Sequence, residues 1–245
     1  MESVKTKGLI IKSADYGEAN RMIKIFTIDL GIISAGVYGA RSKKKGLGAS
    51  SRLFGWGDIL LRGTPDRLRA EEISIREGFY PLSEDIQKLA SAVYFSDLAE
   101  AALGTNNPDA QILRLLLNTL YAICYNSVDI AAAKTVYELR IAAAGGYMPA
   151  VDACAVCGET QGEMWFDIRR GGALCQSCRR PNSVKISPPT LAAMRYILTA
   201  DEKRIFSFRA DSDIIAALGH ISEEYMIEHF ERKFASLDYL KKIST

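Results

Sequence analysis

The first 80 residues alternate apolar and polar positions over short stretches, which is the pattern of half-buried β-strands. Ile23 and Ile25, for example, lie on either side of Lys24. The pattern predicts five strands separated by glycine-rich turns, at 7–13, 22–27, 31–38, 58–62 and 68–79. Five short strands in so short a segment favour a small closed barrel or a sandwich. We expect an OB-fold over residues 1–80, although an SH3-like barrel would give a similar pattern.

From residue 82 the apolar positions recur with helical spacing. Ser83 is expected to open a first helix, Asn107 with Pro108 a second, and Asp129 a third that ends at Gly145. Further helices are predicted to start at Ser187, to span 212–234 and to span 236–243. The fold class is therefore α+β and multidomain. An N-terminal barrel is followed by a helical domain at 81–245, with a four-cysteine module inserted at about 151–181.

The composition is that of an ordinary globular protein, with 48% hydrophobic and 24% charged residues. This excludes disordered and collagen-like chains. The short apolar run near the N-terminus has charges on both sides, unlike a signal peptide, and no stretch approaches 18 consecutive apolar residues. We therefore expect a cytoplasmic protein that does not engage membranes.

The positive charge is concentrated in the first third of the chain. Residues 1–80 contain 14 lysines and arginines against 9 acidic residues, whereas residues 81–150 contain 4 against 7. A local basic surface favours a polyanionic partner, and the alternative is a solvated charged face. The acidic helical segment is better suited to protein contacts.

A basic loop is predicted between the third and fourth strands, at residues 39–46. Such a loop beside a barrel can follow a phosphate backbone, and arginine can engage two phosphate oxygens at once. The alternative is a loop that only increases solubility. The predicted nucleic-acid-contact residues are Lys12, Arg21, Lys24, Arg41, Lys43, Lys44, Lys45 and Arg52. Tyr16 and Tyr38 are candidates for stacking on bases, whereas Phe54 and Trp56 are expected mainly in the barrel core or a domain interface.

Four of the five cysteines form two CxxC pairs, and 17 residues separate the pairs. The pairs are Cys154 with Cys157 and Cys175 with Cys178. Two tight turns can aim four thiolates at one point, so the spacing predicts a structural zinc site with a closed ligand shell. Disulfides or a redox CxxC motif are the alternatives, which a reducing compartment and the paired spacing disfavour. Cys124 lies in an apolar helical stretch and is expected to be buried.

No motif for catalysis is found. The sequence contains no phosphate-binding P-loop and only two histidines, His220 and His229, both in one amphipathic stretch. We therefore predict no catalytic residue and a protein that is not an enzyme.

An ordered set of short segments resembles the bacterial recombination mediator family RecO. The resemblance covers nearly the whole chain, and only its cysteine pairs are specific by themselves. Its segments are 15–18 with Arg21, 31–34, 39–43, 53–54, 137–139, 146–147, Tyr225, His229 and 236–240.

The resemblance implies a non-enzymatic protein of DNA repair and recombination. Such proteins bind single- and double-stranded DNA, anneal complementary strands, and act with RecR to load RecA onto DNA coated by single-strand binding protein (SSB). The family contacts the acidic, apolar C-terminal tail of SSB through its helical domain, for which Lys134 and Arg140 are the candidates here. The alternatives are a general OB-fold and zinc-ribbon module that binds RNA or DNA in transcription or translation, and an interaction scaffold.

Overall fold

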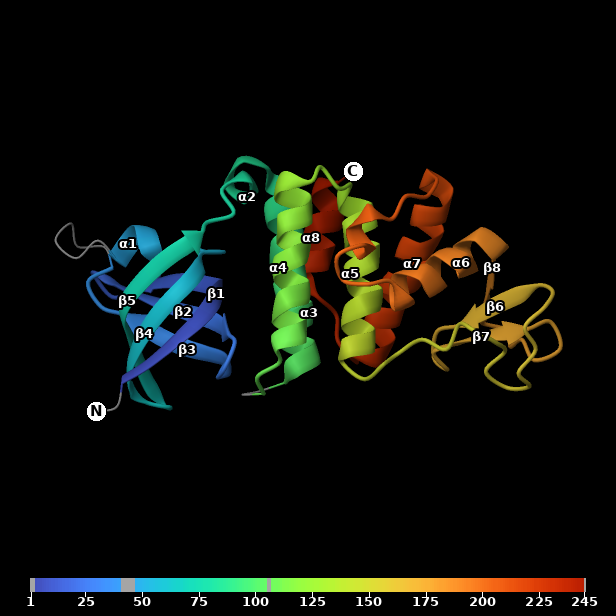
Figure 1. Ribbon diagram of the computed structural model, residues 1–245, viewed down its shortest axis with the longest axis horizontal. Helices are drawn as coiled ribbons and strands as arrows, with labels where there is room; N and C mark the ends of the chain where they lie inside the picture. Colours follow the sequence, from blue (N-terminus) through green and yellow to red (C-terminus); the bar gives the residue numbers. More distant parts are fainter. Residues whose placement is uncertain (1–2, 41–46, 105–106, 245) are drawn as a thin grey trace. The chain divides into compact units, whose positions relative to one another are not determined.

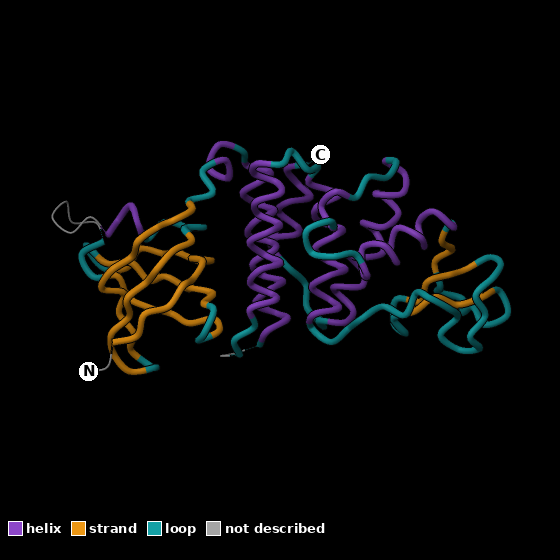
Figure 2. The backbone as a smooth tube through the Cα atoms, viewed as in Figure 1, coloured by secondary structure: helices purple, strands orange, loops and turns teal. Residues whose placement is uncertain are grey.

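The computed structural model describes residues 3–40, 47–104 and 107–244 of the 245-residue chain. The chain forms two compact units (Figures 1 and 2). The barrel unit comprises residues 1–85 and 103–114, and the helical unit comprises residues 86–102 and 115–245. Across the described ranges, no helix has both the length and the apolar character needed to cross a membrane.

The barrel unit is a closed five-stranded barrel with the strand order β1-β2-β3-β5-β4. Its pairs are antiparallel except for β3 with β5, and the pairing of β1 with β4 closes the barrel. The OB-like barrel predicted from the strand pattern is therefore confirmed. Its strands are β1 (Ser3–Tyr16), β2 (Asn20–Thr27), β3 (Gly31–Val37), β4 (Trp56–Thr64) and β5 (Arg67–Glu77), and the short helix α1 (Leu47–Ser50) lies between β3 and β4.

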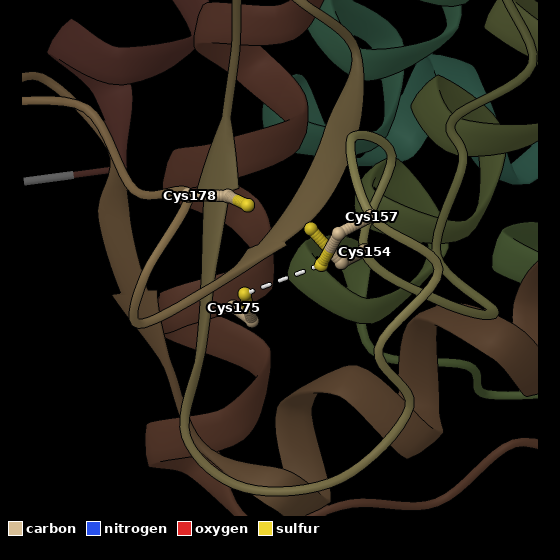
Figure 3. Close-up of side chains that lie close together, drawn as sticks. All are labelled: Cys154, Cys157, Cys175 and Cys178. Carbon is tan, nitrogen blue, oxygen red and sulfur yellow. Dashed lines mark hydrogen bonds between the residues drawn. The ribbon is translucent and has the colours of Figure 1, made fainter.

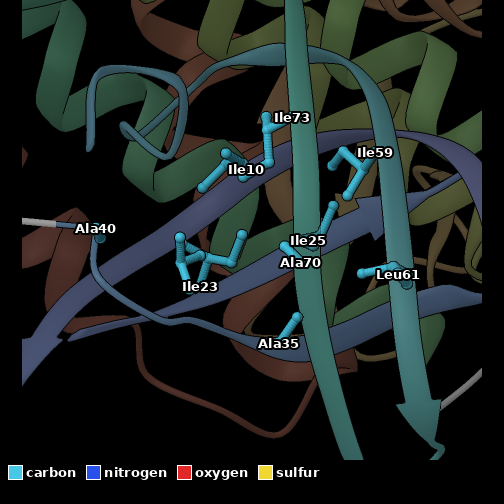
Figure 4. Packing of buried hydrophobic residues seen from close by; sticks show 10 residues of the cluster. Ile10, Ile23, Ile25, Ala35, Ala40, Ile59, Leu61, Ala70 and Ile73 are labelled. Atoms are coloured by element: carbon cyan, nitrogen blue, oxygen red, sulfur yellow. The ribbon is translucent and has the colours of Figure 1, made fainter. Parts of the chain in front are cut away.

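The alternating apolar residues fill the barrel interior (Figure 4). Ile10, Ile23 and Ile25 are fully buried there, with Ile59 and Leu61 facing them from β4. β4 and β5 approach so closely at Gly57 that a methyl group would collide with the Ser74 carbonyl oxygen. The alternation thus explains both the core and the polar outer face of the barrel. Phe54 is buried, as expected, whereas Trp56 is half-buried.

Helices make up most of the rest of the chain. In the helical unit α5 packs against both α6 and α7. A three-stranded sheet in the order β7-β6-β8 carries the inserted segment. The helices are α2 (Pro81–Glu84), α3 (Ile86–Leu103), α4 (Ala110–Tyr125), α5 (Ile130–Ala144), α6 (Pro188–Thr199), the 3-10 helix η1 (Ile205–Ser207), α7 (Ser212–His229) and α8 (Ala235–Ile243); the strands are β6 (Met164–Asp167), β7 (Gly172–Cys175) and β8 (Val184–Ile186).

Three predicted helix boundaries, two starts and one end, were wrong, each for a local reason. Ser83 lies within the short helix α2, and the long helix begins at Ile86 because Asp85 has an extended backbone. The cap of α4 is Asp109 rather than Asn107, since the Asp109 carboxylate accepts the backbone N–H groups of residues 111 and 112. Helix α7 ends at His229, before Glu231, whose φ of 49° breaks the helical path. The predicted cap at Asp129 is confirmed.

Candidate metal centre and nucleic-acid interface

The four paired cysteines gather at one point in the helical unit (Figure 3). Their four Sγ atoms lie within 4.8 Å of one another, and the Sγ atoms of Cys157 and Cys175 are 3.7 Å apart. A metal–sulfur bond of about 2.3 Å in a tetrahedral site gives sulfur–sulfur edges of about 3.8 Å. None of the five cysteines, all within the described residues, forms a disulfide. The four thiols therefore fit a tetrahedrally coordinated metal ion better than a pair of disulfides.

Two tight backbone turns aim the sulfur atoms at this point. In the first turn the Gly158 N–H donates to the Cys154 carbonyl oxygen over 2.9 Å, and Gly158 has a φ of 78°, which suits glycine. In the second turn the N–H groups of Cys178 and Arg179 donate to the Cys175 carbonyl oxygen. Strand β7 ends at Cys175 and so delivers this residue to the cluster. The CxxC spacing thus becomes a pair of ligand-bearing turns.

The surroundings of the thiols favour a thiolate at Cys154. Burial raises the pKa of Cys154, but hydrogen bonds from the backbone at Cys157, Cys175 and Val156 outweigh it and lower the pKa to about 6. Hydrogen bonds with Cys157 and Cys175 raise the pKa of Cys178 to about 12. The cluster therefore offers one thiol that ionises easily, and a metal ion has to displace the protons of the other thiols when it binds. With four protein ligands the shell has no open position for a substrate.

Helices α6 and α7 hold the cysteine-bearing segment in place. The Phe166 ring packs on Tyr225, with 5.7 Å between centroids, and His229 Nε2 lies 2.8 Å from the Ile168 carbonyl oxygen. Arg195 of α6 donates to the carbonyl oxygens of Val151 and Asp152. His229 is thus a packing residue, whereas His220 lies on the exposed face beside Glu224. Cys124, on α4, was expected to be buried but is half-buried, and it lies outside the cluster.

On the barrel, the structure brings two predicted DNA-contact residues together. Lys12 and Lys24 are direct register partners on β1 and β2, beside an irregularity in the pairing. Directly paired residues share one face of the sheet, so the two side chains lie on the same side of the barrel. Lys12 is exposed and Lys24 is half-buried, which places both on the outer face.

Arg21 and Arg52 instead make contacts within the barrel unit. Arg21 pairs with Asp15 over 2.8 Å and donates to the Gly48 carbonyl oxygen, so it braces α1. Arg52 lies over the Tyr80 ring, 4.6 Å from its centroid. The predicted contacts Arg41, Lys43, Lys44 and Lys45 lie outside the described residues.

The sequence reasoning missed Arg69. Its guanidinium lies over the ring of Tyr38, and both side chains are exposed on the barrel. The pairing of Gly36 with Arg69 across β3 and β5 places them together. Because that pairing joins distant strands, only a correct barrel topology and register could have revealed it.

Lys134 and Arg140 are mostly occupied by internal contacts. Lys134 bridges Glu138 and Glu223, each at 3.0 Å, and only 13% of its side chain is exposed. Burial lowers the pKa of Lys134, but the two carboxylates outweigh burial and raise it. Arg140 donates to the Ala200 carbonyl oxygen, while its Nε has no partner and is buried.

Fully buried Glu138 explains why Lys134 is held inside. Its carboxylate accepts the Tyr94 hydroxyl at 2.7 Å and the Ser222 hydroxyl at 2.6 Å, besides the Lys134 ammonium. A buried carboxylate needs such partners, since an unpaired one is very costly. Lys134 is therefore a structural counter-ion, whereas the side chain of Arg140 is half-exposed.

Comparison with known proteins assigns the chain to a family. Residues 1–73 match the family model described as Recombination protein O N terminal, and residues 83–238 match Recombination protein O C terminal. A protein of Acetivibrio thermocellus named DNA repair protein RecO is 31% identical over 246 residues, covering 99% of this chain and 98% of the relative. Proteins of the same name from Alkaliphilus metalliredigens and Anaeromyxobacter dehalogenans are 28% and 30% identical, with at least 98% of each chain covered. The chain therefore belongs to the RecO family of recombination proteins.

Proposed function

We propose that this protein is a recombination mediator in DNA repair that binds single- and double-stranded DNA and anneals complementary strands. With RecR it helps to load RecA onto DNA coated by SSB. The observation that carries the proposal is a basic OB-like barrel in a chain whose relatives are named DNA repair proteins. The proposal assigns no catalytic residue and places the protein in the cytoplasm.

In the proposed division of labour, residues 1–80 bind nucleic acid and residues 81–245 serve protein contacts. The residues proposed to contact phosphates are Lys12, Arg21, Lys24 and Arg52 of the described barrel, together with Arg41, Lys43, Lys44 and Lys45, which lie outside the described residues. Annealing requires two polyanions to approach each other, and a cationic surface screens their repulsion. If about five phosphates of a single strand are neutralised, the log–log slope of affinity against salt is about −3.5.

The metal ion of the cysteine module, at about 151–181, is proposed to be one structural Zn²⁺. Four thiolates are donors that Zn²⁺ favours, and the sulfur–sulfur separation of 3.7 Å suits it. Cys154, Cys157, Cys175 and Cys178 would hold the ion. When bound, it supplies cross-linking of the two turns rather than Lewis-acid chemistry at a substrate.

The helical domain is proposed to receive the acidic, apolar C-terminal tail of SSB. Arg140 is the residue we favour for its carboxylates, because its side chain is half-exposed. Lys134 was the other candidate, and its two ion pairs make it the weaker one.

The alternative is a general OB-fold and metal-ribbon module that binds RNA in transcription or translation. Competition binding distinguishes the two: a labelled single-stranded DNA is displaced by unlabelled DNA or by RNA of the same sequence, across a salt series. The mediator proposal predicts a steep salt dependence and displacement by DNA at least as effective as by RNA. Much stronger displacement by RNA would favour the alternative instead.

A further inference from the structure

An exposed aromatic and cationic cluster lies on the outer face of the barrel. The guanidinium carbon of Arg69, on β5, lies 4.9 Å from the centroid of the Tyr38 ring, which follows β3. Tyr38 is 44% exposed. A guanidinium over an exposed tyrosine ring offers flat surfaces and a positive charge, and both groups are ones on which nucleobases stack.

Tyr16 and Gly36 hold the Tyr38 ring in position. The Tyr16 hydroxyl hydrogen-bonds with Tyr38, and this bond, with burial, raises the pKa of Tyr16. A Cβ atom on Gly36 would lie 3.2 Å from the Tyr38 ring and 3.3 Å from the Tyr16 hydroxyl, so both tyrosines rest over the bare backbone of this glycine. The two tyrosine side chains are therefore held in place before a ligand binds, which reduces the entropic cost of binding.

The cluster lies where OB-folds bind oligonucleotides, across the second and third strands and beside the turns β1–β2 and β4–β5. Tyr16 ends β1, and Arg69 follows the β4–β5 turn. Gly36 pairs with Met22 on β2 and with Arg69 on β5, which puts these positions on one face. The cluster thus occupies the position at which other OB-folds bind oligonucleotides.

The surface beside the cluster carries mixed charges. A groove of about 620 Å³ adjoins the cluster and is lined by Tyr38, Arg69, Leu47 and Ile73, and also by Glu71 and Glu72. Glu71 forms an ion pair with Arg62 over 3.3 Å, so the groove does not present a purely cationic surface to a phosphate. A neutral, flat base can lie against its apolar and aromatic residues without a matching charge.

We propose that Tyr16, Tyr38 and Arg69 form a stacking platform that takes one unpaired base of single-stranded nucleic acid. The base extends the stack of Tyr38 and Arg69, while the lysines elsewhere on the barrel hold phosphates. A paired base inside a duplex has both faces covered, so the platform distinguishes single from double strands. The inference rests on the proposed function, because it names the part of the nucleic acid that this barrel face binds.

A double-mutant cycle tests the platform. Affinities of the full-length wild type and of Tyr38→Ala are measured by fluorescence anisotropy, across a salt series, for an oligothymidylate and for an abasic oligonucleotide of equal length. Stacking predicts that Tyr38→Ala weakens oligothymidylate binding by about 5- to 150-fold and leaves the salt slope unchanged. Binding of the abasic strand should be weak already and should not weaken further.

Three variants serve as controls. Tyr38→Phe keeps the ring but loses the hydrogen bond to Tyr16, so it should bind much more tightly than Tyr38→Ala and somewhat more weakly than the wild type. Arg69→Lys keeps the charge but not the plane, so it should weaken binding to oligothymidylate without altering the salt slope. Tyr121→Ala removes an exposed tyrosine of α4 and should change nothing. Thermal melts of all variants check that each is folded.

Two results separate the platform from the proposed function. If the wild type binds oligothymidylate with a steep salt slope and folded Tyr38→Ala binds equally well, the platform is wrong and the proposed function stands. An equal loss on abasic and normal strands would likewise overturn the platform. If the wild-type protein binds no nucleic acid, both the platform and the proposed function are wrong.

Discussion

His229 Nε2 and the carbonyl oxygen of Ile168 are 2.8 Å apart, which ties the end of α7 to the loop that follows β6. Together with the packing of Phe166 on Tyr225, this contact joins the cysteine-bearing segment to the helical unit. The metal site and the helices should therefore lose stability together, while the barrel keeps its own core.

Removal of the metal ion is expected to destabilise the helical unit and to spare DNA binding by the barrel. Isolated zinc-finger peptides gain about 10–16 kcal/mol from the metal, and part of that stabilisation applies here. Even about 3 kcal/mol would lower the melting temperature by about 6–12 °C in a domain of this size. Chelation and Cys175→Ser should both lower the melting temperature, as measured by calorimetry, and Cys124→Ser is the control. Complete loss of DNA binding in a still-folded, chelated protein would instead place the cysteine module in the DNA site.

Lys134→Ala should strongly destabilise the protein. It leaves the fully buried Glu138 carboxylate without its counter-ion, at a cost of about 3–5 kcal/mol. Lys203→Ala, on the surface, should change the free energy of unfolding by no more than about 0.5 kcal/mol. Urea unfolding of both variants measures the difference. A stable, folded Lys134→Ala protein that no longer binds an SSB tail peptide would restore Lys134 as a partner contact.

Glu223 should contribute to stability only above acidic pH. Burial raises the pKa of Glu223, but the charge of Lys134 and a hydrogen bond from Lys241 outweigh it and leave the pKa below its ordinary value of 4.5. A carboxylate with a lowered folded-state pKa stabilises fully above its unfolded pKa, and this stability is lost as the pH falls through the lowered value. The stability difference between wild type and Glu223→Gln should therefore shrink below pH 4.5, in urea unfolding from pH 7 to pH 3.

Exposed Glu224 supplies the matched control for that measurement. Glu224→Gln changes the same chemical group one residue away, with only an exposed contact to His220. Its effect on stability should be small at every pH. A Glu223→Gln effect that stays constant down to pH 3 would contradict the ion-pair explanation.

Replacing the basic loop should change how DNA binding depends on salt. Lys43→Ala, Lys44→Ala and Lys45→Ala together remove three predicted phosphate contacts, so the log–log slope should become less steep by about 2. A control with equal loss of charge replaces three exposed lysines of the helical unit, Lys203, Lys233 and Lys242. The control should keep the wild-type slope for single-stranded DNA. Equal slopes for the two triple variants would show that the loop does not contact phosphates.

The sequence predicted local structure well because local rules dominated there. Alternation around Ile23 and Ile25 identified strands, and the CxxC pairs identified a cluster whose turns are set by hydrogen bonds only a few residues apart. Long-range pairing could not be foreseen. The meeting of Arg69 with Tyr38 depends on the parallel pairing of β3 with β5. The internal role of Lys134 depends on Glu223, which is far away in the sequence.

The most direct test of the mediator proposal is annealing of two complementary oligonucleotides coated with SSB, without ATP, across a salt series. The account predicts annealing that is accelerated by the protein, is weakened by salt and is reduced in the triple variant of the basic loop. DNA binding without any annealing would support only a general nucleic-acid-binding module. A protein that neither binds DNA nor anneals strands at low salt would contradict the account. The chain would then have the RecO family fold but a different role.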